Sequence, residues 1–374
     1  MKKHLNYYLF FVVIALVLFG ILFLSTLSAP ASIRNFGNPN YYLMHQLYLL
    51  LAGIILSVIA YKFPLNYFKK LAPFLLLANF VLLAFVFLPE IGIKFGGANR
   101  WINIGVGVFQ PSEFLKITAI LYLSALISNK LLEGRKKGWM SVAKKGYHNI
   151  NHIFIPFVVL LAIISVFLAL QPDISTLGII GLTLIIIYFF AGTPIWNTVL
   201  IFLMAIGGFF ALIKFKPYRL DRWLIFLHPE TDPLGKGWQM KQALIAIGSG
   251  GFFGKGWGMS SQKFDFLPQA MSDSIFAILG EETGIIGCLF LVFLFAFFLW
   301  LGVKIAKSSN NKFAQLTALG ITFWISIQAF LNITANLGLA PLAGIPLPFF
   351  SYGGSHLVTE LIGVGILLNI SKNN

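Results

Sequence analysis

Apolar residues fill this chain in long runs that short polar stretches separate. The runs reach about 20 residues, the length that an α-helix needs to cross a hydrocarbon layer roughly 30 Å thick. Open strand edges would leave peptide groups unsatisfied in lipid, so the runs predict helices. We therefore predict a single all-α polytopic membrane domain over 1–374, with ten transmembrane helices at about 6–27, 43–61, 71–89, 111–128, 152–170, 174–191, 195–214, 273–303, 313–337 and 352–370.

Composition supports lipid as the solvent of this chain. It is 58% hydrophobic and 10% charged, which is more apolar surface than a soluble core of 374 residues would bury. The first run follows Lys2 and Lys3 as in a signal peptide, but it is too long for the usual apolar region and lacks a clear small-residue cleavage site. We expect it to stay as the first helix. The single cysteine, Cys288, lies in an apolar run and offers neither a disulfide nor a thiolate metal site.

The net charge of +15 is explained by membrane topology better than by a nucleic-acid partner. With the N-terminus in the cytoplasm, the short outer loops hold only Arg34, Lys94 and Arg100, and the inner segments hold most other cations. This asymmetry predicts a multi-pass protein of the bacterial cytoplasmic membrane with both termini in the cytoplasm. We expect membrane lipids, and no nucleic acid, as its surroundings.

The outer connection at about 215–272, between the seventh and eighth helices, is too long for a simple turn. It contains seven lysines or arginines, although the outer side should be poor in cations. Of the twelve acidic residues, only Glu133 falls in a predicted cytoplasmic loop. Long connections are usually functional, so we place the functional site on the outer face.

A polar motif precedes the fourth helix. It contains Arg100 and Trp101, and then Pro111, which suits a first helical turn. Glu113 and Lys116 follow three residues apart on one helix face, just inside the outer leaflet. An ion pair at that depth is a functional candidate. The alternatives are a helix-dipole partner for Glu113, a snorkelling Lys116 and an interfacial belt position for Trp101.

Further polar residues follow in the outer segments. Asp173, after Gln171 and Pro172, could bind substrate or only cap the sixth helix. Glycines at 248–251 and 254–256 would let backbone N–H groups approach an anion. Side-chain charge for phosphate oxygens would come from Arg219, Arg222, Lys241 and Lys255.

Asp273 stands at the mouth of the predicted eighth helix. A carboxylate that water reaches on one side and hydrocarbon borders on the other can serve as a general base, although a simple N-cap would look the same. Glu281 and Glu282 would lie about 12 Å deeper, at ~1.5 Å per residue. The proline-broken segment 341–348, before Ser351, is tolerated at membrane depth only where protein buries it or it lines a cavity.

Four motifs, in this order, resemble the signature of the shape, elongation, division and sporulation (SEDS) family. They are G-A-x-R-W-I with Q-P-S-E-x-x-K, then Q-P-D, then L-P-x-x-x-x-D-x-I-F-A-x-x-x-E-E-x-G, and P-L-P-F-x-S-Y-G-G-S, and together they cover nearly the whole chain. The resemblance implies a ten-helix peptidoglycan glycosyltransferase of the FtsW/RodA type. Such proteins join the disaccharide units of lipid II, release undecaprenyl diphosphate and work with a class B penicillin-binding protein.

The resemblance also assigns residues. It puts the essential aspartate on Asp273, the loop arginine and tryptophan on Arg100 and Trp101, and the buried pair on Glu113 and Lys116. We predict that Asp273 accepts the proton of the attacking sugar hydroxyl. A divalent cation (Mg²⁺ or Mn²⁺) is compatible with this chemistry, its ligands are unknown, and no organic cofactor is expected. The full set of expected substrate contacts is Arg100, Trp101, Glu113, Lys116, Asp173, Arg219, Arg222, Lys241, Lys255, Lys263 and Ser351.

The chain departs from the family pattern at Ser175 and, on either side of Asp273, at Ser272 and Ser274, and these changes leave the carboxylates in place. Segments 260–263 and 348–351 favour the division branch, FtsW, over the elongation branch, RodA. Two alternatives of other classes stay open. One is a transporter or flippase of lipid-linked precursors, which would place its polar groups near the bilayer midplane. The other is an inactive scaffold of the division machinery.

Overall fold

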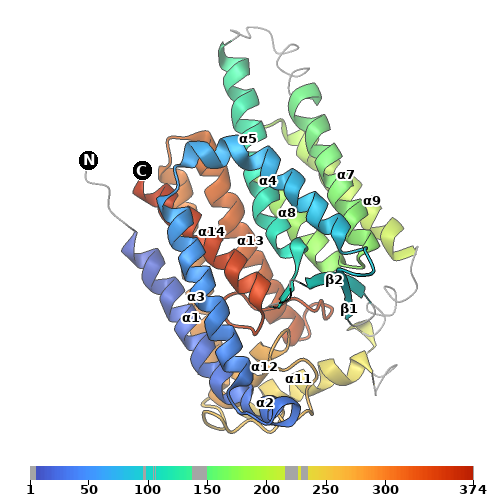
Figure 1. Ribbon diagram of the computed structural model, residues 1–374, viewed down its shortest axis with the longest axis vertical. Coiled ribbons are helices and arrows are strands. Elements are labelled where there is room, and N and C mark those ends of the chain that lie inside the picture. The colour runs from blue at the N-terminus through green and yellow to red at the C-terminus, as the bar shows by residue number, and fades with distance from the viewer. Residues whose placement is uncertain are drawn as a thin grey trace.

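The computed structural model describes residues 6–95, 98–103, 105, 107–136, 150–214, 226–228 and 235–373. Helices dominate it (Figure 1). The described elements, in chain order, are α1 (Tyr7–Leu27), α2 (Ala29–Phe36), α3 (Tyr41–Lys62), α4 (Leu65–Phe85), β1 (Gly92–Phe95), β2 (Ala98–Asn103), β3 (Val108–Phe109), α5 (Pro111–Lys136), a π-helical turn η1 (Ile150–Phe154), α7 (Ile155–Leu170), α8 (Ile174–Phe190), α9 (Ile195–Lys214), α11 (Lys236–Gly250), α12 (Ile275–Ser308), α13 (Lys312–Asn336) and α14 (Gly354–Lys372).

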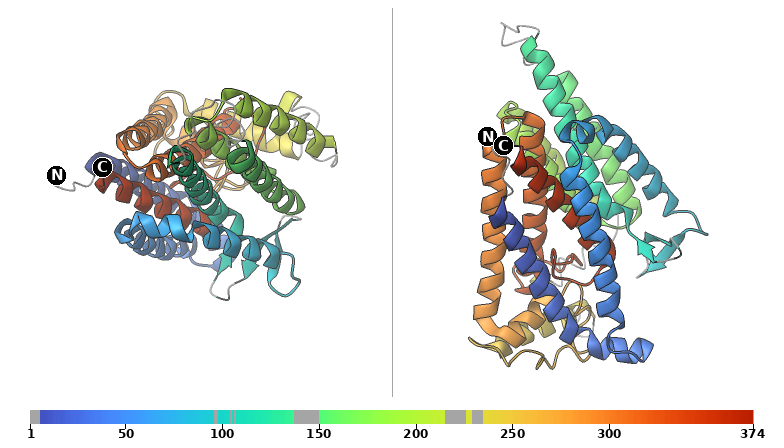
Figure 2. Two further views of the ribbon diagram at one scale, coloured as in Figure 1. Left: turned by 90° about the horizontal axis from the view of Figure 1, so that it is seen from above. Right: turned by 60° about the vertical axis from the view of Figure 1, so that its left-hand side comes forward.

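Eight of the described helices are long and apolar enough to cross a membrane: α1, α3, α4, α5, η1 with α7, α12, α13 and α14. Two shorter apolar helices, α8 and α9, match the sixth and seventh expected spans. The polytopic helical fold is therefore confirmed, and the number of ten crossings stays a prediction. The start of α1 and the end of α14 lie on one side of the molecule, away from α2 and α11 (Figures 1 and 2).

The helices pack with the least apolar ones in the middle. In α5, α13 and α14, 83%, 78% and 83% of the membrane-length window is buried, against 17–44% in the other five long helices. These three central helices are also the least apolar of the eight. Polar side chains are costly where a membrane helix faces lipid, so they collect where protein buries the helix. The interface of α5, α13 and α14 accordingly holds one group of buried polar side chains, and a second group, Glu281 and Glu282, is buried on α12.

Three features differ from the expected pattern. The third membrane helix, α4, begins at Leu65 and not near 71, because Lys69 and Lys70 lie inside its first turns and can reach the membrane surface from there. A three-stranded antiparallel sheet, β1-β2-β3, follows α4, with Ile93 opposite Trp101 and Ile102 opposite Phe109. The outer connection contains helix α11, whose buried face includes Met240, Ala243 and Ala246.

Helix α12 has 34 residues, about 51 Å at 1.5 Å per residue, which exceeds the hydrocarbon thickness. Its path is broken at Gly284, where φ is 66° and ψ is −164°. A Cβ atom there would lie 2.5 Å from the backbone N of Gly254 and from the backbone O of Phe252. At Gly250, a Cβ atom would lie 2.0 Å from the carbonyl oxygen of Gly280. Gly250 and Gly254 therefore serve close packing on α12 and not the anion loops that the sequence suggested.

We expect Gly284→Ala to destabilise the protein by at least about 2 kcal/mol, because alanine disfavours a positive φ and its methyl group would overlap the loop backbone. The measurement is the melting temperature of the detergent-solubilised protein. Gly181→Ala in α8 is the matched control, since nothing lies within 4 Å of a Cβ atom at that position. Equal melting temperatures for the two variants would contradict the role assigned to Gly284.

Candidate active site

Asp273 lies in the turn that leads into α12, and its side chain is half-buried. The N-cap position of α12 belongs to Ser274, so helix capping does not explain Asp273. One carboxylate oxygen accepts a hydrogen bond from the Ser272 hydroxyl at 3.3 Å. The other lies 3.8 Å from where a Cβ atom of Gly344 would stand. Gly344 has φ +64° and no side chain, so it leaves room beside the carboxylate.

The proline-broken segment between α13 and α14 packs directly on this turn. The Ser351 hydroxyl is fully buried, donates to the Ser272 carbonyl and accepts from the Leu347 N–H at 2.8 Å. The Tyr352 N–H donates to the Met271 carbonyl at 2.8 Å. The hydrogen bonds of the Ser351 hydroxyl join the two segments, so this side chain holds the site together, and its expected contact with substrate stays a prediction.

A single face of α13 supports both segments. Trp324, Gln328, Asn332 and Asn336 follow one another at intervals of four residues, and all four are buried. Asn332 donates through Nδ2 to the carbonyls of Asp273, at 2.8 Å, and Ile345, at 2.7 Å. Asn336 donates to the same Asp273 carbonyl at 2.8 Å. This polar stripe was not recognised in the sequence, although its four-residue spacing within an apolar run is the signal that could have revealed it.

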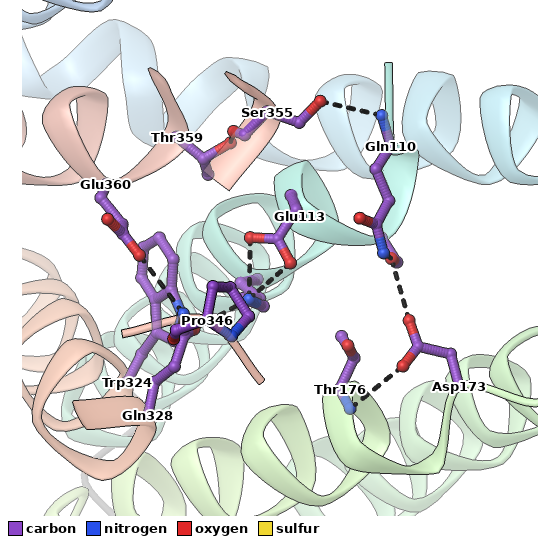
Figure 3. Close-up of polar contacts among 12 residues, drawn as sticks. Gln110, Glu113, Asp173, Thr176, Trp324, Gln328, Pro346, Ser355, Thr359 and Glu360 are labelled. Carbon is purple, nitrogen blue, oxygen red and sulfur yellow. Dashed lines mark hydrogen bonds and ion pairs between the residues drawn. The ribbon is translucent and has the colours of Figure 1, made fainter. Parts of the chain in front are cut away.

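Glu113 and Lys116 form a buried ion pair on α5, with exposures of 4% and 2% and Nζ–Oε distances of 2.8 and 2.9 Å. Lys116 also donates to Oε1 of Gln328 at 2.9 Å. Figure 3 shows how Glu113 from α5, Gln328 from α13 and Glu360 from α14 approach one another around Pro346. The expected pairing of Glu113 with Lys116 is present, and snorkelling of Lys116 is excluded because the ammonium is buried.

Gln328 and Glu360 tie this ion pair to the proline-broken segment. Gln328 donates through Nε2 to the Pro346 carbonyl at 3.1 Å and to Glu360 at 3.3 Å. The other oxygen of Glu360 accepts the N–H of Phe349 at 2.8 Å. Phe349 is buried with φ +62°, a backbone conformation that costs a side-chain residue about 1–2 kcal/mol. The polar network therefore holds a strained turn next to Asp273.

Arg100 and Asp173 meet at the turn between α7 and α8. Arg100 donates through Nε to the Gln171 carbonyl at 3.0 Å, and through its terminal nitrogen to the Pro172 carbonyl. Asp173 is the N-cap of α8, accepting from the Thr176 N–H at 3.4 Å, and it also accepts from the Ser112 hydroxyl at 3.2 Å (Figure 3). Capping is thus present at Asp173, and Arg100 anchors β2 to this turn.

Lys255 and Lys263 pair with the two buried glutamates near the bend of α12. Lys255 lies 2.7 Å from Glu281, and Lys263 lies 3.7 Å from Glu282. The two carboxylates also accept N–H groups of the loop, from Gly258, Ser260, Ser261 and Gln262. In this structure the two lysines help to fasten the 254–263 loop to α12.

We expect Glu281→Gln to loosen this loop, because charge-assisted hydrogen bonds to a buried carboxylate are worth about 1.5–3 kcal/mol each. The measurement is the rate of trypsin cleavage after Lys255 and Lys263 in detergent. Glu90→Gln, at an exposed glutamate, is the control. Unchanged cleavage in the Glu281 variant would show that the glutamate does not hold the loop.

The remaining expected contacts are placed as follows. Lys241 is exposed on α11, whose Gln239 donates to the Ser274 hydroxyl at 3.0 Å, so this helix borders the Asp273 turn. Trp101 is half-buried in β2. Arg219 and Arg222 lie outside the described residues. Among the residues whose positions are described, no three His, Cys, Asp or Glu side chains form a group that could hold a metal ion.

Comparison with known proteins identifies the family of this chain. A family model of cell cycle proteins, the FtsW, RodA and SpoVE type, matches residues 6–374. The chain belongs to this family. Stage V sporulation protein E of Bacillus subtilis (strain 168) is 36% identical over 368 residues, 97% of this chain and 96% of that protein. The probable peptidoglycan glycosyltransferase FtsW of Coxiella burnetii (strain RSA 493 / Nine Mile phase I) is 35% identical over 361 residues, 96% of this chain and 94% of that protein.

The fold of FtsW/RodA/SpoVE proteins is also found in a solved structure. A chain of a peptidoglycan synthase complex, described as coordinating polymerization and crosslinking, matches this family member with a TM-score of 0.78 and 25% identity. The match covers 99% of this chain and 98% of that chain. The resemblance drawn from the four sequence motifs is confirmed, and the SpoVE and FtsW relatives place the chain on the FtsW-like side of the family.

Proposed function

We propose that this chain, an FtsW-like cell-wall glycosyltransferase of the cytoplasmic membrane, polymerises lipid II at the outer membrane face with Asp273 as general base. The observation that carries the proposal is the placement of Asp273. Its carboxylate is half-exposed at the start of α12, beside a glycine, while its backbone is fixed from α13. A general base needs this combination of access and fixed position.

In the proposed reaction the 4-hydroxyl of one lipid-linked sugar attacks the anomeric carbon of another. The new bond joins that oxygen to the anomeric carbon, and the bond from the anomeric carbon to the diphosphate breaks. Asp273 takes the hydroxyl proton, and the electron pair leaves with the diphosphate. We propose Lys241, exposed on the helix that borders the Asp273 turn, as a source of positive charge for the leaving diphosphate.

We propose that a divalent cation binds mainly through the substrate. The part of the chain that is described offers no cluster of three acidic, histidine or cysteine ligands. Mg²⁺ commonly keeps several waters and takes substrate phosphate oxygens together with one or two carboxylates. We therefore propose that Mg²⁺ or Mn²⁺ would arrive on the diphosphate, and no step above depends on it.

The same proposal includes the orientation in the membrane and the partner protein. Helix α1 begins and α14 ends on the side of the molecule away from α2 and α11, so a cytoplasmic N-terminus would place α11, and the Asp273 turn that it borders, on the outer side. The solved relative belongs to a complex that combines polymerization with crosslinking. We propose a class B penicillin-binding protein, a transpeptidase, as the corresponding partner of this chain.

The test is an assay of the purified full chain with lipid II in vesicles, with and without the cognate transpeptidase. Polymeric glycan on a gel supports the proposal. Transfer of lipid II between leaflets without polymer would instead identify a flippase. Binding of the transpeptidase with neither polymer nor transfer would identify a scaffold. Both of these outcomes would overturn the proposed reaction.

A further inference from the structure

Two asparagine side chains of α13 converge on a single backbone atom. Nδ2 of Asn332 and Nδ2 of Asn336 each donate to the carbonyl oxygen of Asp273 at 2.8 Å. The two side chains are only 2% and 1% exposed. They come from adjacent turns of one helix, 59 and 63 residues away along the chain. The contact is therefore part of the packed interior of the protein.

Fixing this carbonyl restrains the direction in which the Asp273 side chain leaves the backbone. The carbonyl of residue 273 lies in the peptide plane that joins Asp273 to Ser274, and its orientation determines ψ of Asp273. Since Cβ is bonded to the same Cα, a rotation of that plane changes the direction of the side chain relative to α12. The Asp273 turn precedes the first helical residue, Ile275, so no intrahelical bond holds this peptide. Its N–H, that of Ser274, donates to the Gln269 carbonyl at 3.3 Å, and the two asparagines hold its carbonyl side.

Asn332 also connects the Asp273 turn to the segment that faces it. It donates to the Ile345 carbonyl at 2.7 Å, in the segment that includes Gly344, the residue beside the Asp273 carboxylate. One carboxamide therefore sets the distance between the catalytic turn and the segment that faces it. The Asn336 carboxamide in turn donates to the Asn332 carbonyl at 2.9 Å, which links the two asparagines.

We propose that Asn332 and Asn336 are positioning residues that hold the Asp273 backbone so that its carboxylate faces the substrate hydroxyl. The inference rests on the proposed function, because it gives the asparagines a role only if Asp273 is the base. They touch the backbone of Asp273 and not the reacting atoms, so their effect is on the rate of the chemical step and not on substrate binding.

The experiment compares Asn332→Ala, Asn336→Ala and the double variant with Asn369→Ala, in the full chain with lipid II. Asn369, on α14, is a matched control. It is 3% exposed, and its Nδ2 donates to the carbonyl of Ala60 at 2.9 Å and to the carbonyl of Phe63. Asn369 lies near the C-terminal end of α14, 96 residues from Asp273 along the chain. It measures what the loss of a buried carboxamide does to stability alone.

Each single variant keeps one donor, so we expect kcat to fall about tenfold, and the double variant to lose at least about 100-fold, with KM within about twofold of the parent. Asn369→Ala should keep kcat while lowering the melting temperature by a similar amount. If the double variant does not fold, the two single variants decide, since each loses a donor that the proposal requires.

The outcomes separate this inference from the proposed function. If Asp273→Asn is inactive while the asparagine variants keep the kcat of Asn369→Ala, the positioning role is wrong and the general base stands. If Asp273→Asn polymerises at the parental rate, the proposed function itself is wrong. If the single and double variants raise KM and keep kcat, the asparagines act on binding, and the positioning role is again overturned.

Discussion

Replacing Asp273 with asparagine should lower the rate of glycan polymerisation at least about 100-fold, the lower end of what a positioned general base contributes. The amide keeps the shape of the side chain but cannot accept the hydroxyl proton. The backbone carbonyl that Asn332 and Asn336 hold is unchanged by the substitution, so the turn should keep its conformation. The measurement is polymer formed per minute from fluorescent lipid II by purified protein.

A second carboxylate substitution serves as the control for Asp273→Asn. Glu90→Gln removes an exposed carboxylate that makes no contact with the Asp273 turn, and it should polymerise normally. The melting temperature of Asp273→Asn should match that of the parent chain, which separates lost chemistry from lost folding. Polymerisation by Asp273→Asn at more than half the parental rate would remove Asp273 from the mechanism.

The second large effect concerns stability. Replacing Lys116 with methionine should cost about 3–5 kcal/mol of folding free energy, because Glu113 would be left as an uncompensated buried charge. Gln328 would also lose the ammonium that donates to its Oε1 at 2.9 Å. The measurement is the melting temperature and the yield of folded protein extracted from membranes.

The double variant with Glu113→Gln provides the control for this prediction. It removes both charges, so it should recover much of the stability that Lys116→Met loses. Such a recovery would show that the cost comes from the unpaired charge and not from the shape of residue 116. Independent, additive losses in the two single variants would contradict a coupled pair.

Much of the membrane architecture could be predicted from the chain, because hydrocarbon imposes a simple rule on sequence. Apolar runs must be helical and about as long as the bilayer is thick, and charges mark their ends. The helix bounds differ most at α4, because the sequence predicts Lys69 and Lys70 in a loop although lysines can extend from a helix to the interface. The sheet over Gly92–Phe109 was missed, since its strands are short and lie outside any apolar run.

The site was only partly predictable, because a motif names residues but not their partners. Glu113 and Lys116 could be paired from their spacing alone, since residues three apart meet on a helix face. Lys255 and Lys263 are predicted as cations for phosphate, but the structure pairs them with Glu281 and Glu282, 26 and 19 residues further along the chain. Contacts over such distances depend on the bend at Gly284, which a sequence pattern does not indicate.

The asparagines of α13 show the same limit. In an apolar run, Asn332 and Asn336 could be tolerated polar residues or parts of a site, and only the position of Asp273 against α13 distinguishes these roles. Ser351 was expected to contact substrate because it belongs to a family motif. Its burial and its bonds to Ser272 and Leu347 show that a motif residue can serve the scaffold around a site.

The burial of the least apolar helices at the centre has a consequence for how the protein is made. Helix α5 enters the membrane long before α13 is synthesised, since Lys116 and Gln328 are 212 residues apart. At about 5–20 residues per second, translation of that interval takes roughly 10–40 s. During this delay, Lys116 has only Glu113 of its own helix to neutralise it. The salt bridge within α5 thus lowers the cost of its charged residues in the membrane until α13 packs against them.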